Sequence, residues 1–430
     1  MKILLYTDLA IRPDQLFWHR DLGLLTKAFR DLGHEAYLVV HLATEPCATP
    51  SVPNELDHPR EQPCVAQQGL PRLSALGRQP FEAPPERSKV WSEVGPHSEI
   101  RNSKSPIPPV LWVSQQEIRD PLWWQSQKPD LVILGLWTRP KYDSIRRAAL
   151  SATPHVIERA DSDGMRTASC GLLTYAKRRF DYFRDRTCRW PSLLSITASV
   201  FYSSASILAT PWIEFRLRKT LQLLPSILVE TPVATALWKS LAGRLGVDPE
   251  KIHHVPHPIQ TDIFKFYPTV PKKNQIISVG RWDSYQKNLP LLLKTLRTFL
   301  DENPSWTSLV IGSGLPAKSP HPQITFLPSL SPSDLARHMQ ESKVFFFSSR
   351  YESFGLAAAE AATCACAIVG PSEIHSQRNE PTFFNSPSYF LLAKLTDASF
   401  LLSNHPARPL SSVTPSEIAQ QIIRLSQSIL

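Results

Sequence analysis

Glycine is scarce in this chain of 430 residues, which contains 15 glycines against 40 prolines. The predicted first strand, residues 1–6, leads into a loop at 9–15 that contains no glycine at all. A nicotinamide dehydrogenase needs a G-x-G-x-x-G motif at this place, so the absence argues against that class of enzyme. Without glycine the backbone of this loop cannot approach an anion closely, and the side chain of Arg12 is expected to make that contact instead.

The six cysteines form no C-x-x-C pair and no spacing typical of metal ligands, so we expect no structural metal site. Cys364 and Cys366 fall in a predicted helix-to-strand region and are interpreted as buried thiols. No secretory signal precedes the first strand, which ends at Thr7 and Asp8. The expected compartment is therefore the reducing cytoplasm.

Acidic residues are fewer than basic ones, and 47 Lys and Arg minus 38 Asp and Glu give a formal charge of +9. This balance favours anionic partners such as nucleotide phosphates or an acidic membrane surface. No RNP motif, zinc finger or aromatic-basic repeat indicates nucleic-acid binding. The hydrophobic content of 42% describes a soluble globular protein, and the length favours two domains because one core rarely exceeds about 250–300 residues.

Two carboxylates, Glu352 and Glu360, frame the most informative stretch of the chain. Small residues that favour helices run from 356 to 365, so a helix is expected to begin near Phe354 with Glu352 in the loop before it. The unpaired backbone N–H groups of a helix start favour an anion. The alternative interpretation is two ordinary glutamates, one capping the helix and one on its solvated face.

Basic side chains lie upstream of this stretch. Residues 275–280 are predicted to form a buried strand, and the loop after it carries Arg281 and Lys287. An Arg guanidinium binds phosphate oxygens in pairs and a Lys adds a mobile charge, although loop cations are more often only solvated. The following strand ends in Gly312-Ser-Gly314, a turn at which backbone can approach a ligand.

The patterns V-G-R-x(5)-K and E-x-F-G-x-x-x-x-E together resemble the signature of retaining glycosyltransferases of group 1 (glycosyltransferase family 4). The resemblance extends over residues 275–370. It implies an α/β protein with the GT-B fold, in which two doubly wound Rossmann-like domains face a cleft. It also implies hexosyl transfer from a nucleotide-sugar donor to a glycan, lipid-linked or small-molecule acceptor. No cofactor and no metal are implied, because two cations take the place of a divalent ion.

The resemblance assigns a role to each matching residue. Arg281 and Lys287 would hold the donor diphosphate and stabilise the leaving group. Glu352 would bind hydroxyls of the transferred sugar, and Glu360 those of the ribose. Further donor contacts are implied for the glycine turn and the start of the helix: Gly312, Gly314, Phe354, Gly355 and Leu356.

Asp161 follows a predicted strand at 155–159 and occupies the place of a catalytic group near the reacting sugar. The His that accompanies this position in the family is absent. The sequence Asp161-Ser-Asp163 also allows a metal-binding interpretation, as in metal-dependent glycosyltransferases of the other major fold.

The predicted domains are 1–266 for the acceptor, with a proline-rich insertion at about 44–121, and 267–413 for the donor. Structure is expected to resume at Asp130 after the insertion. A last helix at 414–430 would pack back on the first domain. The crossover between the domains matches the family at Val255, Pro256 and Phe264 but has His257 where Asn is usual.

Residues 177–219 are basic at both ends and uncharged between Arg189 and Glu214. A helix from Pro191 to Pro211 would carry a leucine-rich stripe on one face and a serine stripe on the other. The first interpretation is a helix buried in the N-terminal domain. The second is a peripheral contact with the inner membrane face, with arginines on the lipid head groups, and a membrane span is a third.

One alternative from another functional class stays open at this point. The glycine-free first loop, the absent His and the altered crossover are also compatible with a glycosyltransferase-like protein that binds a sugar nucleotide, or acts as a scaffold, without transfer. Binding without turnover would distinguish that protein from the enzyme.

Overall fold

The computed structural model describes ten segments of the chain: residues 1–8, 21–41, 110–136, 138–160, 172–187, 191–350, 352, 354–370, 389–390 and 414–427. Two sheets, each parallel throughout, dominate these segments. The loop at 9–15, Asp161 and most of the predicted insertion lie outside the described residues.

The N-terminal sheet has seven strands in the order β3-β2-β1-β4-β5-β6-β7. Sequential numbering from β1 gives the order 3-2-1-4-5-6 of Rossmann sheets, extended by one strand. Its strands are β1 (Lys2–Thr7), β2 (Glu35–His41), β3 (Val110–Val113), β4 (Leu131–Gly135), β5 (Val156–Arg159), β6 (Ser226–Val229) and β7 (Ile252–His254).

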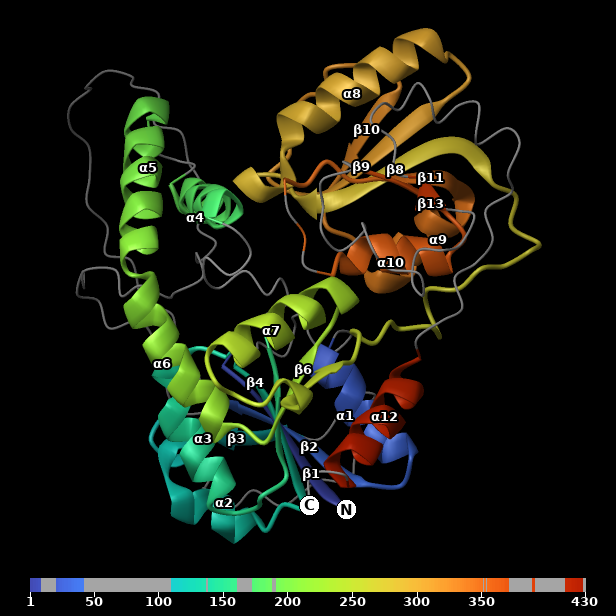
Figure 1. Ribbon diagram of the computed structural model, residues 1–430. Helices are drawn as coiled ribbons and strands as arrows, with labels where there is room; N and C mark the ends of the chain where they lie inside the picture. The colour runs from blue at the N-terminus through green and yellow to red at the C-terminus, as the bar shows by residue number, and fades with distance from the viewer. Residues whose placement is uncertain are drawn as a thin grey trace, which may run out of the picture. The chain divides into compact units, whose positions relative to one another are not determined.

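Helices cover both faces of this sheet, as Figure 1 shows. Alternate residues of β1 point to opposite faces: Ile3 and Leu5 join a core with α1, whereas Leu4 and Tyr6 join a core with α2 and α3. The helices are α1 (Asp21–Asp31), α2 (Pro121–Gln127), α3 (Asp143–Leu150) and α7 (Pro232–Arg244). A strand buried on both faces explains why β1 is apolar without alternation.

Strand β3 and helix α2 lie before Asp130, where structure was expected to resume, so the described structure corrects that expectation. The four residues of β3 pair with β2, and their short run beside prolines gives little periodicity to detect. Asp120 caps α2 by accepting a hydrogen bond from the Leu122 N–H at 3.0 Å.

The C-terminal sheet has the order β10-β9-β8-β11-β12-β13, which is again 3-2-1-4-5-6. Its strands are β8 (Lys273–Arg281), β9 (Thr307–Ser313), β10 (Ile324–Leu327), β11 (Ser342–Phe346), β12 (Ala367–Val369) and β13 (Tyr389–Phe390). Helix α8 (Leu289–Glu302) covers one face; α9 (Pro332–Glu341) and α10 (Leu356–Thr363) cover the other. Ser331 caps α9, and its hydroxyl accepts a hydrogen bond from the Asp334 N–H at 3.2 Å.

Helix α12 (Pro415–Gln427) packs beside α1, and Ile418 and Ile422 enter the core with Leu22 and Leu25. Thr414 and Glu417 form a reciprocal capping box at its start, with hydrogen bonds of 2.9 and 3.2 Å. The end of the chain that the structure describes therefore contributes to the N-terminal core.

Helices α4 (Leu172–Arg186), α5 (Ser192–Leu208) and α6 (Thr210–Leu223) follow β5. The predicted single helix ends at Leu208, and Pro211 lies in the first turn of α6, where a missing N–H costs nothing. In the described part of the chain no single helix is long and apolar enough to cross a membrane, but α5 and α6, bent by 62°, reach the length and hydropathy together.

Candidate functional site

The expected site residues gather at one edge of the C-terminal sheet. Strands β9, β8 and β11 are neighbours and parallel, so the loops after them emerge at the same edge. The connections from β8 and β11 leave toward opposite sides of the sheet, and such a switch point is where doubly wound sheets bind ligands. We refer to residues 281–288 as the donor loop and to residues 347–355 as the acidic loop.

Lys287 of the donor loop and Glu352 of the acidic loop form an ion pair, with 2.5 Å between Nζ and Oε1. Their side chains are 21% and 14% exposed, so the pair is partly buried. Ser349 donates to the same carboxylate oxygen at 2.6 Å, and Ser348 donates to the Lys287 carbonyl at 2.7 Å. Residues 65 positions apart are thus brought together.

The donor loop is held by its own turns. Ser284 caps a short 3-10 helix (Tyr285–Lys287), and Asn288 takes a left-handed conformation before α8 begins. Arg350 ties the two loops together, because its N–H donates to the Gln286 carbonyl at 2.8 Å. Arg281 is the last residue of β8 and is exposed at the same edge.

Gly312 of β9 lies close against Gly280 of β8, and Gly314 permits the turn after β9 to pack against the donor loop. A Cβ on Gly312 would lie 1.9 Å from the Gly280 carbonyl oxygen, and one on Gly314 would lie 2.4 Å from the Asp283 nitrogen. Both have positive φ angles, 137° and 72°. Close approach of β9 to β8 at Gly312, and of the following turn to the donor loop at Gly314, is therefore the role of these glycines that the structure describes.

Helix α10 begins beside Glu352. Gly355 precedes it with a φ of +77°, and Ala358 and Ala359 already donate to its carbonyl. The N–H groups at this start present the positive end of the helix toward the acidic loop. Phe354 is buried in the hydrophobic core, and Glu360 is buried one turn into the helix.

Helix α4 contacts the donor loop directly. The carboxylate of Asp185 accepts hydrogen bonds from Ser284 Oγ at 2.7 Å and from the Gln286 N–H at 3.1 Å. The ring of Tyr285 lies between the guanidinium groups of Arg184 and Arg350, at 5.3 and 4.2 Å. Sequence reasoning did not select Asp185, since nothing near it in the chain marks its partner.

A second cluster surrounds His257 at the crossover between the sheets. His257 Nδ1 lies 3.0 Å from Asp21, and Nε2 lies 3.4 Å from Glu230. Burial alone would lower the pKa of His257, but the two carboxylates outweigh burial and raise it to about 9. Burial likewise opposes ionisation of Asp21, yet Arg159 and His257 hold its pKa well below the usual range. The imidazole also meets the Phe354 ring edge-on at 5.3 Å.

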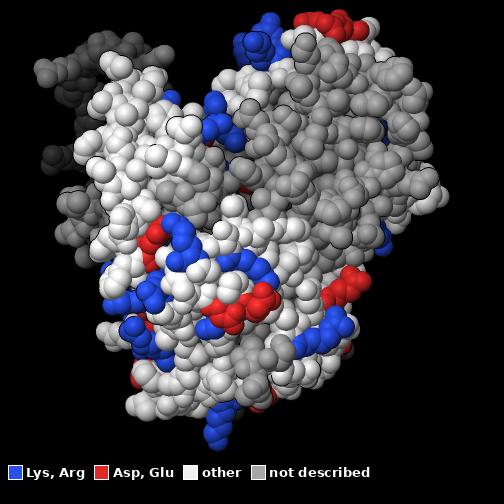
Figure 2. Space-filling view, viewed as in Figure 1, with Lys and Arg blue, Asp and Glu red and all other residues white. Residues whose placement is uncertain are grey.

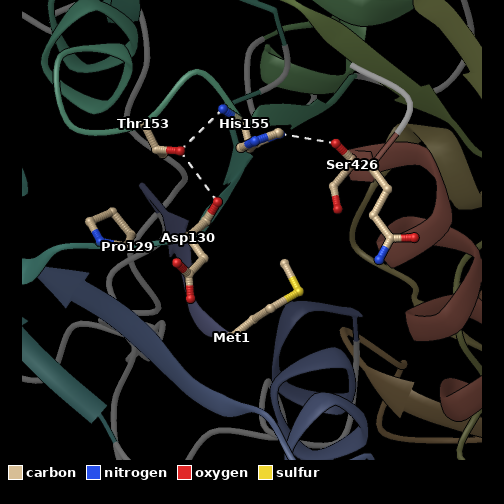
Figure 3. A pocket seen from close by; sticks show the side chains of 7 residues that line it. Met1, Pro129, Asp130, Thr153, His155 and Ser426 are labelled. Carbon is tan, nitrogen blue, oxygen red and sulfur yellow. Dashed lines mark hydrogen bonds between the residues drawn. The ribbon is translucent and has the colours of Figure 1, made fainter. Parts of the chain in front are cut away.

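A cavity of about 490 Å³ lies at the opposite edge of the N-terminal sheet. Met1, Asp130 and His155 directly precede β1, β4 and β5, so this cavity is at the amino ends of the strands (Figure 3). Hydrogen bonds from Thr153 to the Asp130 carbonyl and from the His155 N–H to Thr153 rigidify its wall. It is separate from the loops at the carboxyl ends.

The metal-binding interpretation of Asp161 and Asp163 falls outside the described residues. Within the described ranges, no group of three or more His, Cys, Asp and Glu side chains could hold a metal ion. The two cysteines that were expected to be buried, Cys364 and Cys366, are buried and free.

Residues 259–374 match the protein family described as Glycosyl transferases group 1. No curated protein sequence matches the chain. Among solved structures, Anabaena Alr3699/HepE in complex with UDP is 11% identical, with a TM-score of 0.51 over 100% of this chain and 98% of that one. Sucrose-phosphate synthase (tll1590) from Thermosynechococcus elongatus is 14% identical, with a TM-score of 0.52 over 100% of this chain and 99% of that one.

At these identities the two structures establish the fold, which is GT-B, and the family match applies to residues 259–374. The matched range includes both Arg281 and Lys287 of the donor loop and both Glu352 and Glu360. The chain thus has the GT-B fold, and the range that carries strands β8 to β12 is similar to the group 1 glycosyltransferases.

Proposed function

We propose that this enzyme is a retaining glycosyltransferase of family 4 that takes its sugar from a nucleotide-sugar donor. The observation that carries the proposal is the Lys287–Glu352 pair, 2.5 Å apart at the switch point of the sheet. An ammonium has three N–H donors and a carboxylate has several acceptor sites, so both groups can bind a ligand while they stay paired.

A sugar diphosphate offers each of these groups a matching partner. The phosphate oxygens accept from Lys287, from Arg281 and from the N–H groups of Gly355 and Leu356 at the start of α10. The sugar hydroxyls donate to Glu352, and the ribose hydroxyls donate to Glu360. The family resemblance assigns a role near the reacting carbon to Asp161, which lies outside the described residues.

The chemical step breaks the bond between the anomeric carbon and the diphosphate oxygen, which leaves with the electron pair. An acceptor hydroxyl forms the new bond on the same face of the sugar and releases its proton. Lys287 and Arg281 stabilise the charge that develops on the leaving diphosphate, the role for which a metal ion serves elsewhere. On this proposal no metal and no cofactor are needed.

A uridine nucleotide is the first donor to test, because the Anabaena structure similar to this chain contains UDP. The proposed acceptor is a glycan or a lipid-linked molecule, and the proposed location is the cytoplasm with a peripheral contact at the inner membrane face.

The test begins with thermal shifts of the full chain in UDP-, GDP- and ADP-sugars. The donor that gives the largest shift is then incubated with the enzyme in the absence of acceptor, so that water accepts the sugar. NMR at early times gives the anomeric configuration of the released sugar, which should be the same as in the donor. Lys287→Ala and Glu352→Ala should each lower the rate by about 100-fold or more. Lys294→Ala removes an exposed cation from α8 and should keep the wild-type rate.

Inversion of configuration would overturn the retaining mechanism, and wild-type rates in Glu352→Ala would overturn its role. Donor binding without hydrolysis or transfer would favour the binding-protein alternative.

A further inference from the structure

Helix α5 buries small polar side chains and exposes large apolar ones, the opposite of an ordinary surface helix. The side chains that it buries are serines: Ser195, Ser199, Ser203 and Ser206. Its large apolar side chains face outward, and Leu193, Phe201 and Leu208 are 79%, 76% and 83% exposed. An amphipathic helix on a globular protein normally buries its apolar stripe, but the described part of the chain supplies no partner for this face of α5.

The buried serine face is fully used by α4 and by the helix itself. Ser203 donates to the Ala176 carbonyl of α4 at 2.8 Å, and Ser199 donates to the Ser195 carbonyl at 2.6 Å. The hydroxyls of Ser195 and Thr187 lie 2.5 Å apart. Small side chains allow close approach of the two helices, and their hydrogen bonds fix which face of α5 points outward.

The exposed apolar surface extends beyond α5. Ten of the fifteen exposed large hydrophobic residues in the described part of the chain lie between 172 and 215. We call this set the apolar face: Leu172, Leu173, Leu193, Leu194, Ile196, Val200, Phe201, Leu208, Trp212 and Phe215. The surface over α5 is white, without charged side chains, in Figure 2.

Cations border the apolar face where it continues onto α6. The guanidinium of Arg216 lies 5.5 Å from the Trp212 ring, and the Lys219 ammonium lies 4.4 Å from the Phe215 ring. Both cations are exposed. The acid of this helix, Glu214, already pairs with Arg244 at 2.6 Å. Aromatic rings beside Lys and Arg are the arrangement that favours the boundary between lipid and water.

We propose that the apolar face docks on an anionic lipid surface, with α5 lying in the interface plane and the cations of α6 on the head groups. Charge selects this occupant. Described residues 172–187 and 191–224 carry eight basic side chains against three acidic ones, Asp181, Asp185 and Glu214. A second copy of the chain would offer like charge to that border, whereas an anionic bilayer offers the opposite charge.

The experiment is flotation of the full chain with vesicles of phosphatidylcholine alone and of phosphatidylcholine with phosphatidylglycerol. The wild type should float with the anionic vesicles. The double variant Phe201→Ser with Leu208→Ser should bind roughly 100-fold or more weakly, since each side chain loses its burial in lipid. Leu122→Ser is the matched control, because Leu122 is 71% exposed on α2, outside the apolar face.

Arg216→Gln with Lys219→Gln tests the charge. Each cation near an anionic surface contributes about 1 kcal/mol, so the pair should weaken binding by roughly 30-fold at low salt and leave little preference for anionic vesicles. Circular dichroism checks that every variant keeps its helices.

The proposal is overturned if the wild type floats with neither kind of vesicle. If that chain is instead a dimer in sedimentation, and Phe201→Ser with Leu208→Ser makes it monomeric, the face is an interface between copies. Equal flotation of wild type and the apolar double variant also overturns it. Donor thermal shifts on the same samples are independent of these outcomes, so a failed donor assignment and a failed lipid assignment are distinguishable.

Discussion

Raising the pH from 6 to 10 should destabilise this protein through one histidine. His257 sits between Asp21 and Glu230, at 3.0 and 3.4 Å, with 18% of its side chain exposed. Its folded-state pKa of about 9 exceeds the ordinary value of 6.5, so the native state holds a proton that the unfolded chain has released. The stabilisation is fully present below pH 6.5 and is lost as pH rises through about 9.

The magnitude follows from the size of the pKa change. Between the two pKa values the native state binds one more proton than the unfolded state, so the free energy of unfolding falls by about 1.4 kcal/mol per pH unit. Over the window from 6.5 to about 9 the loss is at most on the order of 3 kcal/mol, because the Arg159 guanidinium lies 3.1 Å from Nδ1 and opposes the charge on the imidazole. That is a large part of the stability of a typical domain, which is about 5–15 kcal/mol.

The assay is urea unfolding at half-unit steps between pH 6 and pH 10 for wild type and His257→Gln. The difference between the two free energies of unfolding should shrink across the window, because the variant lacks the proton-binding group. His254→Gln is the control: burial lowers the pKa of His254, so this residue is neutral in both states above pH 7. A wild-type curve parallel to that of His257→Gln across the whole window would refute the reasoning.

Three further predictions concern other contacts. Gly312→Ala should lower the free energy of unfolding in urea by about 3 kcal/mol or more, because the new Cβ would overlap a carbonyl oxygen. Gly355→Ala should lower it by only about 1 kcal/mol, because the new Cβ has space there and only the positive φ is unfavourable. Asp185→Ala removes the acceptor of two donor-loop hydrogen bonds and should raise the KM for donor by about tenfold in initial-rate assays, with melting temperature unchanged. Glu158 and Arg146 form a buried ion pair at 2.6 Å, so Glu158→Gln should lower the free energy of unfolding in urea by about 3–5 kcal/mol. The double variant Arg146→Met with Glu158→Leu should recover most of that stability, because it leaves no unpaired buried charge.

The C-terminal sheet could be read from sequence because its strands are short continuous apolar runs bounded by glycine or polar residues. The strand predicted at 275–280 is β8 in the structure, and its bounds differ by one or two residues at each end. The meeting of Lys287 with Glu352 required knowledge of strand order as well, and this came from the resemblance to a family rather than from spacing.

Other features had no local signal. Pro211 was taken as the end of a helix, yet proline fits the first turn of a new one equally well, and only packing of Leu217 and Leu221 against α7 decides between them. The cluster around His257 joins Asp21 to a residue 236 positions away. Arg159 ends β5 and Glu230 directly follows β6, and nothing in the sequence marks His257 as the residue that contacts both.

Helix α4 is fastened on two sides, to the serines of α5 and, through Asp185, to the donor loop. Any molecule that restrains α5 thus acts on a helix that also contacts the donor loop, where we propose that the sugar nucleotide binds. Thermodynamic linkage is reciprocal. If a molecule bound at α5 raises the affinity of the protein for a sugar nucleotide by some factor, the sugar nucleotide must raise the affinity at α5 by the same factor. The protein would then stay bound at α5 longest where the sugar nucleotide is abundant.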